Sequence, residues 1–330
     1  MSPACRQRGV SLIELMVALV LGLFLIYGAV TIYTQSRASY RTNEAVARLQ
    51  ETARLALNVL ESDLRMANYW GMNSRASFIA NRAGPTSVST PAPFTTYALV
   101  NTCGTHWAIN VEEYLGGSNN SYGLTCAGTS PSGTADVIVV RRASGADPVE
   151  LDPTRIYLQA SRVQGTLFVP DASCLDPYDI TCLPASYAPP ASRSRELEVH
   201  AYYVSTQSAL RPDVPALRRK RLANIVAGPA VIDEEIVPGV EDMQVRFGID
   251  TNGDTNADSY VNPGAVGSAS VVSATIWLRI RAEDREQGLV DSRTYNFGFP
   301  GASNFTPAGE QQKYRRVVVS RTIQLRNTRT

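Results

Sequence analysis

Two hydrophobic patterns follow each other in the first seventy residues of the chain. From Val10 to about Tyr33 nearly every residue is apolar, and Glu14 is the single formal charge. About twenty apolar residues are enough for a helix to cross the ~30 Å hydrocarbon core of a bilayer. The first pattern therefore predicts a membrane helix over residues 10–33.

The second pattern is amphipathic and continues the helix to about residue 70. Apolar residues recur at spacings of three and four, with charged residues between them. No proline occurs between Val10 and Tyr69, and Asn68 and Gly71 are typical residues for a helix end. We expect one helix of about 55–60 residues, roughly 85 Å long, whose second half, residues 34–70, packs on a globular domain. Its apolar stripe consists of Val46, Leu49, Ala53, Ala56, Leu60, Leu64 and Ala67.

Residues 71–330 have the pattern of a β-rich globular domain. The segment 73–135 is rich in Gly, Ser, Thr, Asn and Pro, which is typical of long loops. From Asp136 onward apolar and polar residues alternate with a period of two, the pattern of half-buried strands. We therefore expect an α+β fold in which the long amino-terminal helix packs on an antiparallel sheet with long loops. The expected strands are 136–140, 155–159, 166–169, 197–203, 243–249, 274–280 and 313–326.

The flanks of the apolar run predict its orientation. Arg6 and Arg8 precede it, and basic residues stay on the cytoplasmic side of a membrane helix. Everything after Tyr33 then lies across the membrane in an oxidising compartment, the periplasm. We expect a single-pass inner-membrane protein with a cytoplasmic amino terminus.

The four cysteines beyond the membrane helix are an even number, which is typical of disulfides in an exported domain. Three pairings are possible. We favour Cys103–Cys126 and Cys174–Cys182, because each pair lies in a loop rich in Gly, Ser and Pro and closes a local ring. Four unpaired buried thiols are the alternative.

The overall charge excludes a general attraction to nucleic acid. The chain has 330 residues, 44% of them hydrophobic, with 31 basic and 30 acidic residues and a net charge of +1. Such a chain can bury a sizeable core, and it has no global field for phosphates. The basic runs 218–221 and 315–316 could contact DNA, but the acids 233–235 favour a self-paired or solvated face. We expect no specific nucleic-acid partner.

A calcium site is one interpretation of the loop 250–258. Oxygen-bearing side chains occupy alternate positions, and Ca²⁺ takes about six to eight oxygen ligands. The spacing departs from an EF-hand, because Gly253 is one place early and Val261 stands where the bidentate Glu belongs. The alternative is a hairpin turn rich in Asx residues. The possible ligands are Asp250, Asn252, Asp254, Asn256 and Asp258.

The sequence does not favour an enzyme. The two histidines, His106 and His200, are far apart, and His200 falls on the polar phase of a strand, where we expect a solvated side chain. The chain has no G-x-S-x-G, no H-E-x-x-H and no phosphate-binding glycine loop. No cofactor other than a calcium ion is implied.

The start of the membrane helix admits three interpretations. A secretory signal would end in a small-residue cleavage site, which this run lacks. A plain membrane anchor explains neither Gly9 nor Glu14. In the third, Gly9, then four residues, then Glu14 and a long apolar helix resemble the prepilin leader of type IV pilins and type II secretion pseudopilins.

This resemblance implies that a prepilin peptidase removes residues 1–9 by cutting after Gly9. Val10 would become the mature amino terminus and a site of methylation, although the family usually has Phe there. Glu14 is expected to direct assembly by pairing with the free amino terminus of a neighbouring subunit, since an unpaired carboxylate in an apolar bundle is costly.

The chain as a whole resembles the PilW-type minor pilins of type IV pili. Residues 239–250, 271–281 and 315–327 carry this similarity, whereas residues 73–230 contribute little. The resemblance implies a pilin-like fold and a low-abundance subunit that joins other minor pilins and the major pilin. Their complex would prime pilus assembly, lie at the pilus tip beneath a tip adhesin, and support twitching motility and cell adhesion.

Two other functions stay open. A type II secretion minor pseudopilin has the same architecture but serves protein export, and loss of secretion rather than motility in a deletion strain would favour it. A membrane-tethered adhesin or binding module would use the loop 250–258. Ligand binding by the soluble part of the chain, without other pilins, would favour that function.

Overall fold

The computed structural model describes residues 9–82, 103–104, 106–173, 175–181, 183, 191–223 and 231–328. The chain forms two compact units, the first ending at Arg48 and the second spanning Leu49–Thr330. Its elements are α1 (Leu12–Met66), η1 (Ala76–Phe78), β1 (Ile79–Ala80), β2 (Leu115–Ser118), β3 (Val137–Ala143), β4 (Tyr157–Ser161), β5 (Gly165–Phe168), β6 (Ser192–Ser205), β7 (Ala216–Leu222), β8 (Val231–Pro238), β9 (Val240–Asp250), β10 (Ser259–Val261), β11 (Ser270–Arg281), η4 (Gly309–Lys313) and β12 (Arg316–Gln324).

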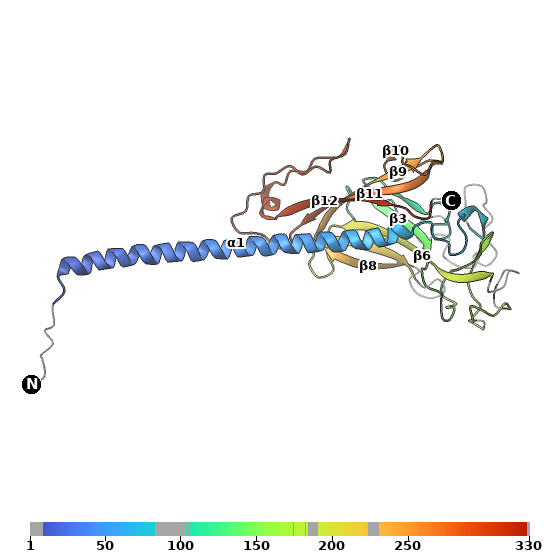
Figure 1. Ribbon diagram of the computed structural model, residues 1–330, viewed down its shortest axis with the longest axis horizontal. Coiled ribbons are helices and arrows are strands. Elements are labelled where there is room, and N and C mark those ends of the chain that lie inside the picture. The colour runs from blue at the N-terminus through green and yellow to red at the C-terminus, as the bar shows by residue number, and fades with distance from the viewer. Residues whose placement is uncertain are drawn as a thin grey trace, which may run out of the picture. The chain divides into compact units, whose positions relative to one another are not determined.

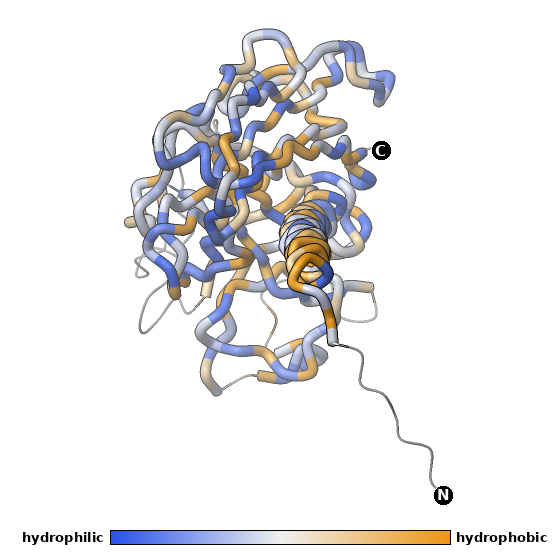
Figure 2. The backbone as a smooth tube through the Cα atoms, turned by 90° about the vertical axis from the view of Figure 1, so that its left-hand side faces the viewer, coloured by the Kyte–Doolittle hydropathy of each residue, from blue (hydrophilic) through white to orange (hydrophobic). Residues whose placement is uncertain are grey.

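Helix α1 is continuous for 55 residues, the length expected from the sequence (Figure 1). Figure 2 shows its amino-terminal part as a run of hydrophobic residues. Glu14 in the first turn and Arg65 in the last turn complement the helix dipole. The helix ends because Asn68 (φ 62°) and Gly71 (φ 70°) adopt left-handed conformations, which asparagine and glycine accept at helix ends.

A residue from the far end of the sequence closes the carboxy-terminal end of α1. The Asn327 side-chain amide donates to the Ala67 carbonyl oxygen at 3.1 Å, and the Asn68 side-chain amide donates to the Asn327 carbonyl oxygen at 2.9 Å. The last carbonyls of a helix have no partner within the helix. Asn327 therefore supplies a hydrogen bond that α1 cannot make by itself.

Two β-sheets make up most of the second unit. The eight-stranded sheet has the order β1-β5-β4-β6-β3-β2, with β7 paired to β6 and β8 paired to β7, and the four-stranded sheet has the order β10-β9-β11-β12. The sequence predicted an antiparallel sheet, and the chain has two sheets. Gly239, with φ 93°, lies at the turn between β8 of the first sheet and β9 of the second. One pairing is parallel, that of the two-residue strand β1 with β5.

The main core lies where the second half of α1 meets both sheets. Apolar residues of α1 are buried together with apolar residues of β9 and β11, and Leu60 and Leu64 are fully buried. From Leu49 onward the amphipathic half of the helix packs on the β-domain, whereas residues 34–48 of the predicted segment 34–70 belong to the first unit. We call its buried apolar residues the helix stripe: Leu49, Ala53, Ala56, Leu57, Leu60 and Leu64.

A second core lies on the other face of the eight-stranded sheet. Strand β6 directs Tyr202 into the first core and Tyr203 into the second. Trp107, from the segment before β2, also packs in the second core. The prediction of a half-buried strand over 197–203 was therefore wrong for its second half. Both faces are covered there, so His200 and Tyr202 are buried.

Asp136, just before β3, joins the two sheets. Its N–H donates to the Met243 carbonyl oxygen at 2.8 Å, and its carboxylate accepts the Val245 N–H at 2.7 Å. Burial raises the pKa of the Asp136 carboxyl to about 6, although the hydrogen bond that the carboxylate accepts from the Val245 N–H lowers the pKa. A carboxylate in this position therefore ionises less readily in the folded protein than in the unfolded chain.

Candidate functional site

The residues expected to be processed lie just before α1. Gly9 and Val10 are exposed and not helical. A Cβ added to Gly9 would have no neighbouring atom within 4 Å. The bond between them is open to a peptidase in the part of the chain that the structure describes. Residues 1–8, with Arg6 and Arg8, lie outside that part.

Glu14 forms a capping box with Ser11. The Ser11 N–H donates to Glu14 Oε2 at 3.2 Å, and the Glu14 N–H donates to Ser11 Oγ at 3.2 Å. Each side chain thereby satisfies a backbone N–H that a helix leaves free in its first turn. Ser11 was not among the residues predicted from the sequence, although Ser-x-x-Glu before an apolar run is the signature of this box.

The segment after Glu14 presents apolar side chains on every side of the helix. Phe24, Leu25 and Ile26 are 71%, 75% and 63% exposed. Successive helical residues are about 100° apart around the axis, so three neighbours cover most of the circumference. The helix is long and apolar enough to cross a membrane. These features indicate membrane anchoring.

A buried polar cluster, which we call the Asp63 hub, joins α1 to β3 and β6. Asp63 Oδ2 lies 2.6 Å from His200 Nδ1 and accepts the Tyr202 hydroxyl at 3.0 Å. Asp63 Oδ1 accepts Arg142 Nε at 2.7 Å, and Arg142 also pairs with Glu198. Asp63 is 4% exposed and His200 6%. Asp63, Arg142, Glu198, His200 and Tyr202 make up the hub.

The Asp63 hub favours an ionised carboxylate in a buried place. Burial raises the pKa of Asp63, but hydrogen bonds and charge from His200 and Arg142 outweigh it and hold the pKa at about 2. Asp63, Glu198 and His200 also bring three possible metal-ligand atoms within 4.8 Å of one another. Because the Arg142 cation already bridges the two carboxylates, the arrangement has the chemistry of an ion-pair network that fixes the helix on the sheet.

The Asp63 hub was not predicted from the sequence. We expected His200 to be solvated, and this was wrong, because α1 covers the face of β6 that carries it. Asp63 follows Leu60 by three residues and so falls in the phase of the helix stripe. A charged residue at a position of the apolar stripe was the signal in the sequence that could have indicated a buried ion pair. Its partner lies 137 residues away and has no local signature.

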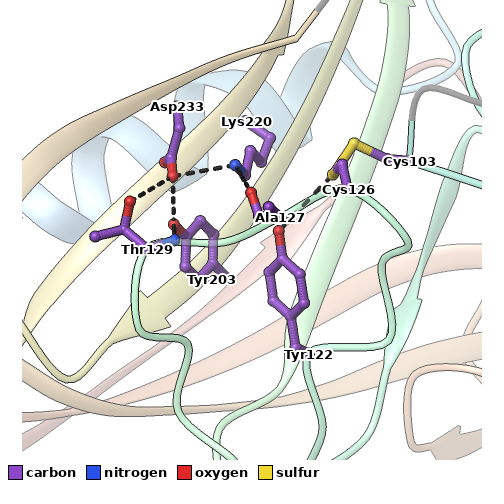
Figure 3. Close-up of a disulfide and its surroundings, with 8 residues drawn as sticks. All are labelled: Cys103, Tyr122, Cys126, Ala127, Thr129, Tyr203, Lys220 and Asp233. Atoms are coloured by element: carbon purple, nitrogen blue, oxygen red, sulfur yellow. Dashed lines mark hydrogen bonds and ion pairs between the residues drawn. A yellow bond between two sulfur atoms is a disulfide. The ribbon is translucent and has the colours of Figure 1, made fainter.

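The Cys103–Cys126 disulfide is formed, as the sequence predicted (Figure 3). The two α-carbons are 4.4 Å apart, and the Tyr122 hydroxyl lies 3.8 Å from Cys126 Sγ. Closing a ring over a sequence separation of 23 residues stabilises by about 3 kcal/mol, chiefly by restricting the unfolded chain. Cys174 and Cys182 lie outside the described residues, so their pairing stays a prediction.

The loop after the disulfide is fixed to the β7–β8 hairpin (Figure 3). The Lys220 ammonium donates to the Ala127 carbonyl oxygen and lies 3.0 Å from Asp233 Oδ2. The same carboxylate oxygen accepts the hydroxyls of Thr129 and Tyr203 at 2.9 and 2.8 Å. The loop over the second core is therefore held by the disulfide and by this hydrogen-bonded group.

The basic run 218–221 lies in strand β7, which was not among the predicted strands. Its charges are paired with acids on β8, which lies beside it, in agreement with the expected self-paired face. The basic pair 315–316 is engaged in the same way. The ion pairs are Arg218–Asp233 (3.1 Å), Arg219–Glu234 (2.7 Å), Lys220–Asp233 (3.0 Å), Arg221–Glu234 (3.5 Å), Arg315–Glu286 (2.8 Å) and Arg316–Glu241 (2.8 Å).

The loop between β9 and β10 is organised by its own Asx side chains. The Asp250 carboxylate accepts the N–H groups of Gly253 and Thr255 at 2.7 and 2.8 Å. The Asp258 carboxylate accepts the N–H of Thr251 at 2.7 Å. These are the hydrogen bonds of the Asx-rich turn, whereas calcium binding stays a prediction. The residues named for it, Asp250, Asn252, Asp254, Asn256 and Asp258, all lie in or beside this loop.

Comparison with known proteins connects both ends of the chain to pili. Residues 5–29 match the prokaryotic N-terminal methylation motif, and residues 201–327 match the family described as type IV pilus-assembly protein W. The second match spans β7 to β12 with the end of β6. A search of curated proteins found no match.

A solved structure of a type IV-like pilin from Thermus thermophilus is similar over 85% of this chain and 98% of its own chain. The sequence identity is 14% and the TM-score is 0.37. The two sequence matches rest on the prepilin leader with its apolar helix and on the carboxy-terminal strands. They support a type IV pilin-like protein of the PilW type.

Proposed function

We propose that the chain is a minor pilin that enters a type IV pilus through α1, after a prepilin peptidase has cut behind Gly9. One observation carries the proposal. A single unbroken helix joins an exposed apolar segment, whose only formal charge is Glu14, to a stripe buried in the core of a β-domain. One helix therefore contributes both to the core of the domain and to a segment that suits lipid or other apolar helices.

The proposed organisation has four parts along the chain. Residues 1–9 form the cleaved leader, residues 10–33 the membrane and assembly helix, residues 34–70 its amphipathic continuation, and residues 71–330 the periplasmic domain. The amino terminus lies in the cytoplasm before processing. After assembly the subunit lies at the pilus tip with other minor pilins, above the major pilin and beneath a tip adhesin.

Assembly exchanges one apolar environment for another. Residues 10–33 leave lipid for a bundle of similar helices, so the hydrophobic free energy changes little. The Glu14 carboxylate then pairs with the ammonium group at Val10 of a neighbouring subunit. An unpaired charge in a bundle of low dielectric constant is costly, so this pair favours one axial register. Priming of assembly, and with it twitching motility and adhesion, would depend on that register.

The first test is the intact mass and the amino-terminal sequence of the chain extracted from membranes of cells with a prepilin peptidase. We expect a chain that begins at Val10, with or without one added methyl group. Gly9→Val is the matched control and should keep its full length, because a bulkier residue blocks the cut. A wild-type chain that begins at Met1 would exclude processing as a pilin.

The second test uses Glu14→Ala. We expect normal cleavage but a loss of the chain from sheared fibres and from complexes with other minor pilins. Normal fibre numbers and normal co-purification in this variant would contradict the proposed role of Glu14. A deletion strain that loses protein secretion and keeps twitching motility would assign the chain to a secretion system instead.

A further inference from the structure

We propose that one face of α1 binds the phosphate headgroup of an anionic phospholipid where the helix leaves the membrane on the periplasmic side. The inference rests on the membrane topology of the proposed function. Successive helical residues turn by about 100°, so residues spaced by four, seven and eight positions share one face. Tyr33 and Tyr40 on this face are 65% and 70% exposed, and its two arginines are exposed as well. We call the face the Arg37 surface, and it consists of Tyr33, Arg37, Tyr40 and Arg41.

The two arginines of the Arg37 surface have no acidic partner among the residues that the structure describes. Glu44, the next acid along the helix and on the same face, pairs with Arg48 at 2.7 Å instead. Between Val10 and Glu44 the only other charged residue is Glu14, at the opposite end of the apolar segment. The end of the membrane segment therefore presents two unpaired positive charges one helical turn apart.

The position of the Arg37 surface along α1 matches the headgroup layer of a bilayer. The hydrocarbon core takes about 20 helical residues, and the headgroup layer extends about 5–8 Å beyond it on each side. Counted from Leu15, where the charge-free run begins, these residues end at Thr34, and Arg37 lies about 5 Å further along the axis. Helical side chains lean toward the amino terminus, which here is the side of the membrane. Arg41, one turn further on, therefore directs its long side chain back toward the same layer.

The residue types of the Arg37 surface suit a lipid phosphodiester. A guanidinium presents paired N–H donors that match two phosphate oxygens. Tyrosine rings lie at the headgroup level of membranes, where the ring is in an apolar layer and the hydroxyl can donate to a polar group. Acidic side chains of a neighbouring subunit would also pair with the two cations. The depth of the arginines and the two tyrosines beside them favour the lipid.

The test uses the full chain in nanodiscs that contain equal amounts of phosphatidylglycerol and phosphatidylcholine. Native mass spectrometry counts the lipids that the released chain retains. One basic residue near an anionic surface strengthens binding about fivefold, so we expect the wild type to retain phosphatidylglycerol over phosphatidylcholine by about fivefold or more. The double variant Arg37→Gln, Arg41→Gln should retain the two lipids equally. Arg54→Gln is the matched control, because Arg54 is an exposed arginine further along α1, and it should keep the wild-type ratio.

The outcomes separate the lipid site from the proposed function. Equal retention of the two lipids by the wild type, or an unchanged ratio in the double variant, would overturn the lipid site. An unchanged ratio together with loss of the double variant from sheared fibres would assign the arginines to a neighbouring subunit instead. The lipid ratio requires neither cleavage nor assembly. A wild-type chain that begins at Met1 therefore contradicts the proposed function alone, and equal retention by a chain that begins at Val10 contradicts the lipid site alone.

Discussion

Helix α1 is held to the β-domain by two contacts of different chemistry. The helix stripe shares a core with apolar residues of β9 and β11, whereas Asp63 makes hydrogen bonds and ion pairs with β3 and β6. Apolar burial is non-directional and scales with area, so it tolerates small shifts of the helix. A buried ion-pair network does not, because a shift leaves charges unpaired. The stripe makes the helix pack, and the Asp63 hub fixes where it packs.

The largest effect is expected from Asp63→Ala. This change leaves Arg142 and His200 without their common acceptor in a buried place, and loss of one partner of a buried pair costs about 3–5 kcal/mol. Urea unfolding of the full chain in detergent, followed by tryptophan fluorescence, measures the loss. Trp70 and Trp107 lie in the second core and report on the domain.

Leu60→Ala is the matched control for the apolar contact. It removes a fully buried side chain one turn before Asp63, at a cost of about 2–5 kcal/mol from lost transfer energy and the cavity left behind. The two losses should differ in their dependence on pH, since only Asp63 titrates. An Asp63→Ala variant as stable as wild type would remove the distinction between the two contacts.

The next effect is a loss of stability in acid. The pKa of Asp63 is about 2 in the folded protein, below its ordinary value of 3.8, so the unfolded chain binds the proton first. The stabilisation is complete above about pH 5 and is lost as the pH falls through 4 towards 2, by about 2 kcal/mol in total. The difference in unfolding free energy between wild type and Asp63→Asn should shrink over this range.

Asp136→Asn is a control of opposite sign. The folded-state pKa of Asp136 is raised to about 6, so folding favours its protonated form. Its contribution to stability is present below about pH 4 and is lost as the pH rises through 6. The wild type should therefore lose stability relative to Asp136→Asn as the pH rises from 4 to 7. A pH-independent difference would show that the buried carboxyl does not titrate as described.

The smallest effect is expected at the rim of the helix contact. Arg321 on β12 pairs with Glu61 of α1, but the two side chains are 36% and 16% exposed. Partly exposed pairs contribute about 0–1 kcal/mol, so Arg321→Ala should change the unfolding free energy by less than 1 kcal/mol. A loss as large as that of Asp63→Ala would show that exposure does not decide which charges hold the helix.

The features that the sequence predicted are those whose causes are local. The length of α1 follows from the absence of proline and from an apolar run that an amphipathic pattern continues, and β9 and β11 follow from alternation of apolar and polar residues. The Cys103–Cys126 pair closes a short ring within one loop. None of these inferences required knowledge of which segments meet in space.

The features that the sequence did not predict depend on distant partners. Strand β7 carries four basic residues in a row, and they pair with acids of β8, which lies beside it. The prediction of a solvated His200 was wrong because α1, which lies far away in sequence, covers the face of β6 that carries His200. The division of the strands into two sheets is set by which strands pair. Long-range pairing, rather than local propensity, decided each of these cases.

The closure of α1 by Asn327 has a consequence for synthesis. Asn68 and Asn327 are 259 residues apart, and a ribosome that adds about 5–20 residues per second needs roughly 10–50 s to make that length. Strand β12, which completes the four-stranded sheet, emerges only at the end of this interval. Until then the helix stripe has no complete sheet to cover it. A nascent chain of this protein therefore passes through a stage of many seconds in which the apolar face of the helix is uncovered and open to a chaperone.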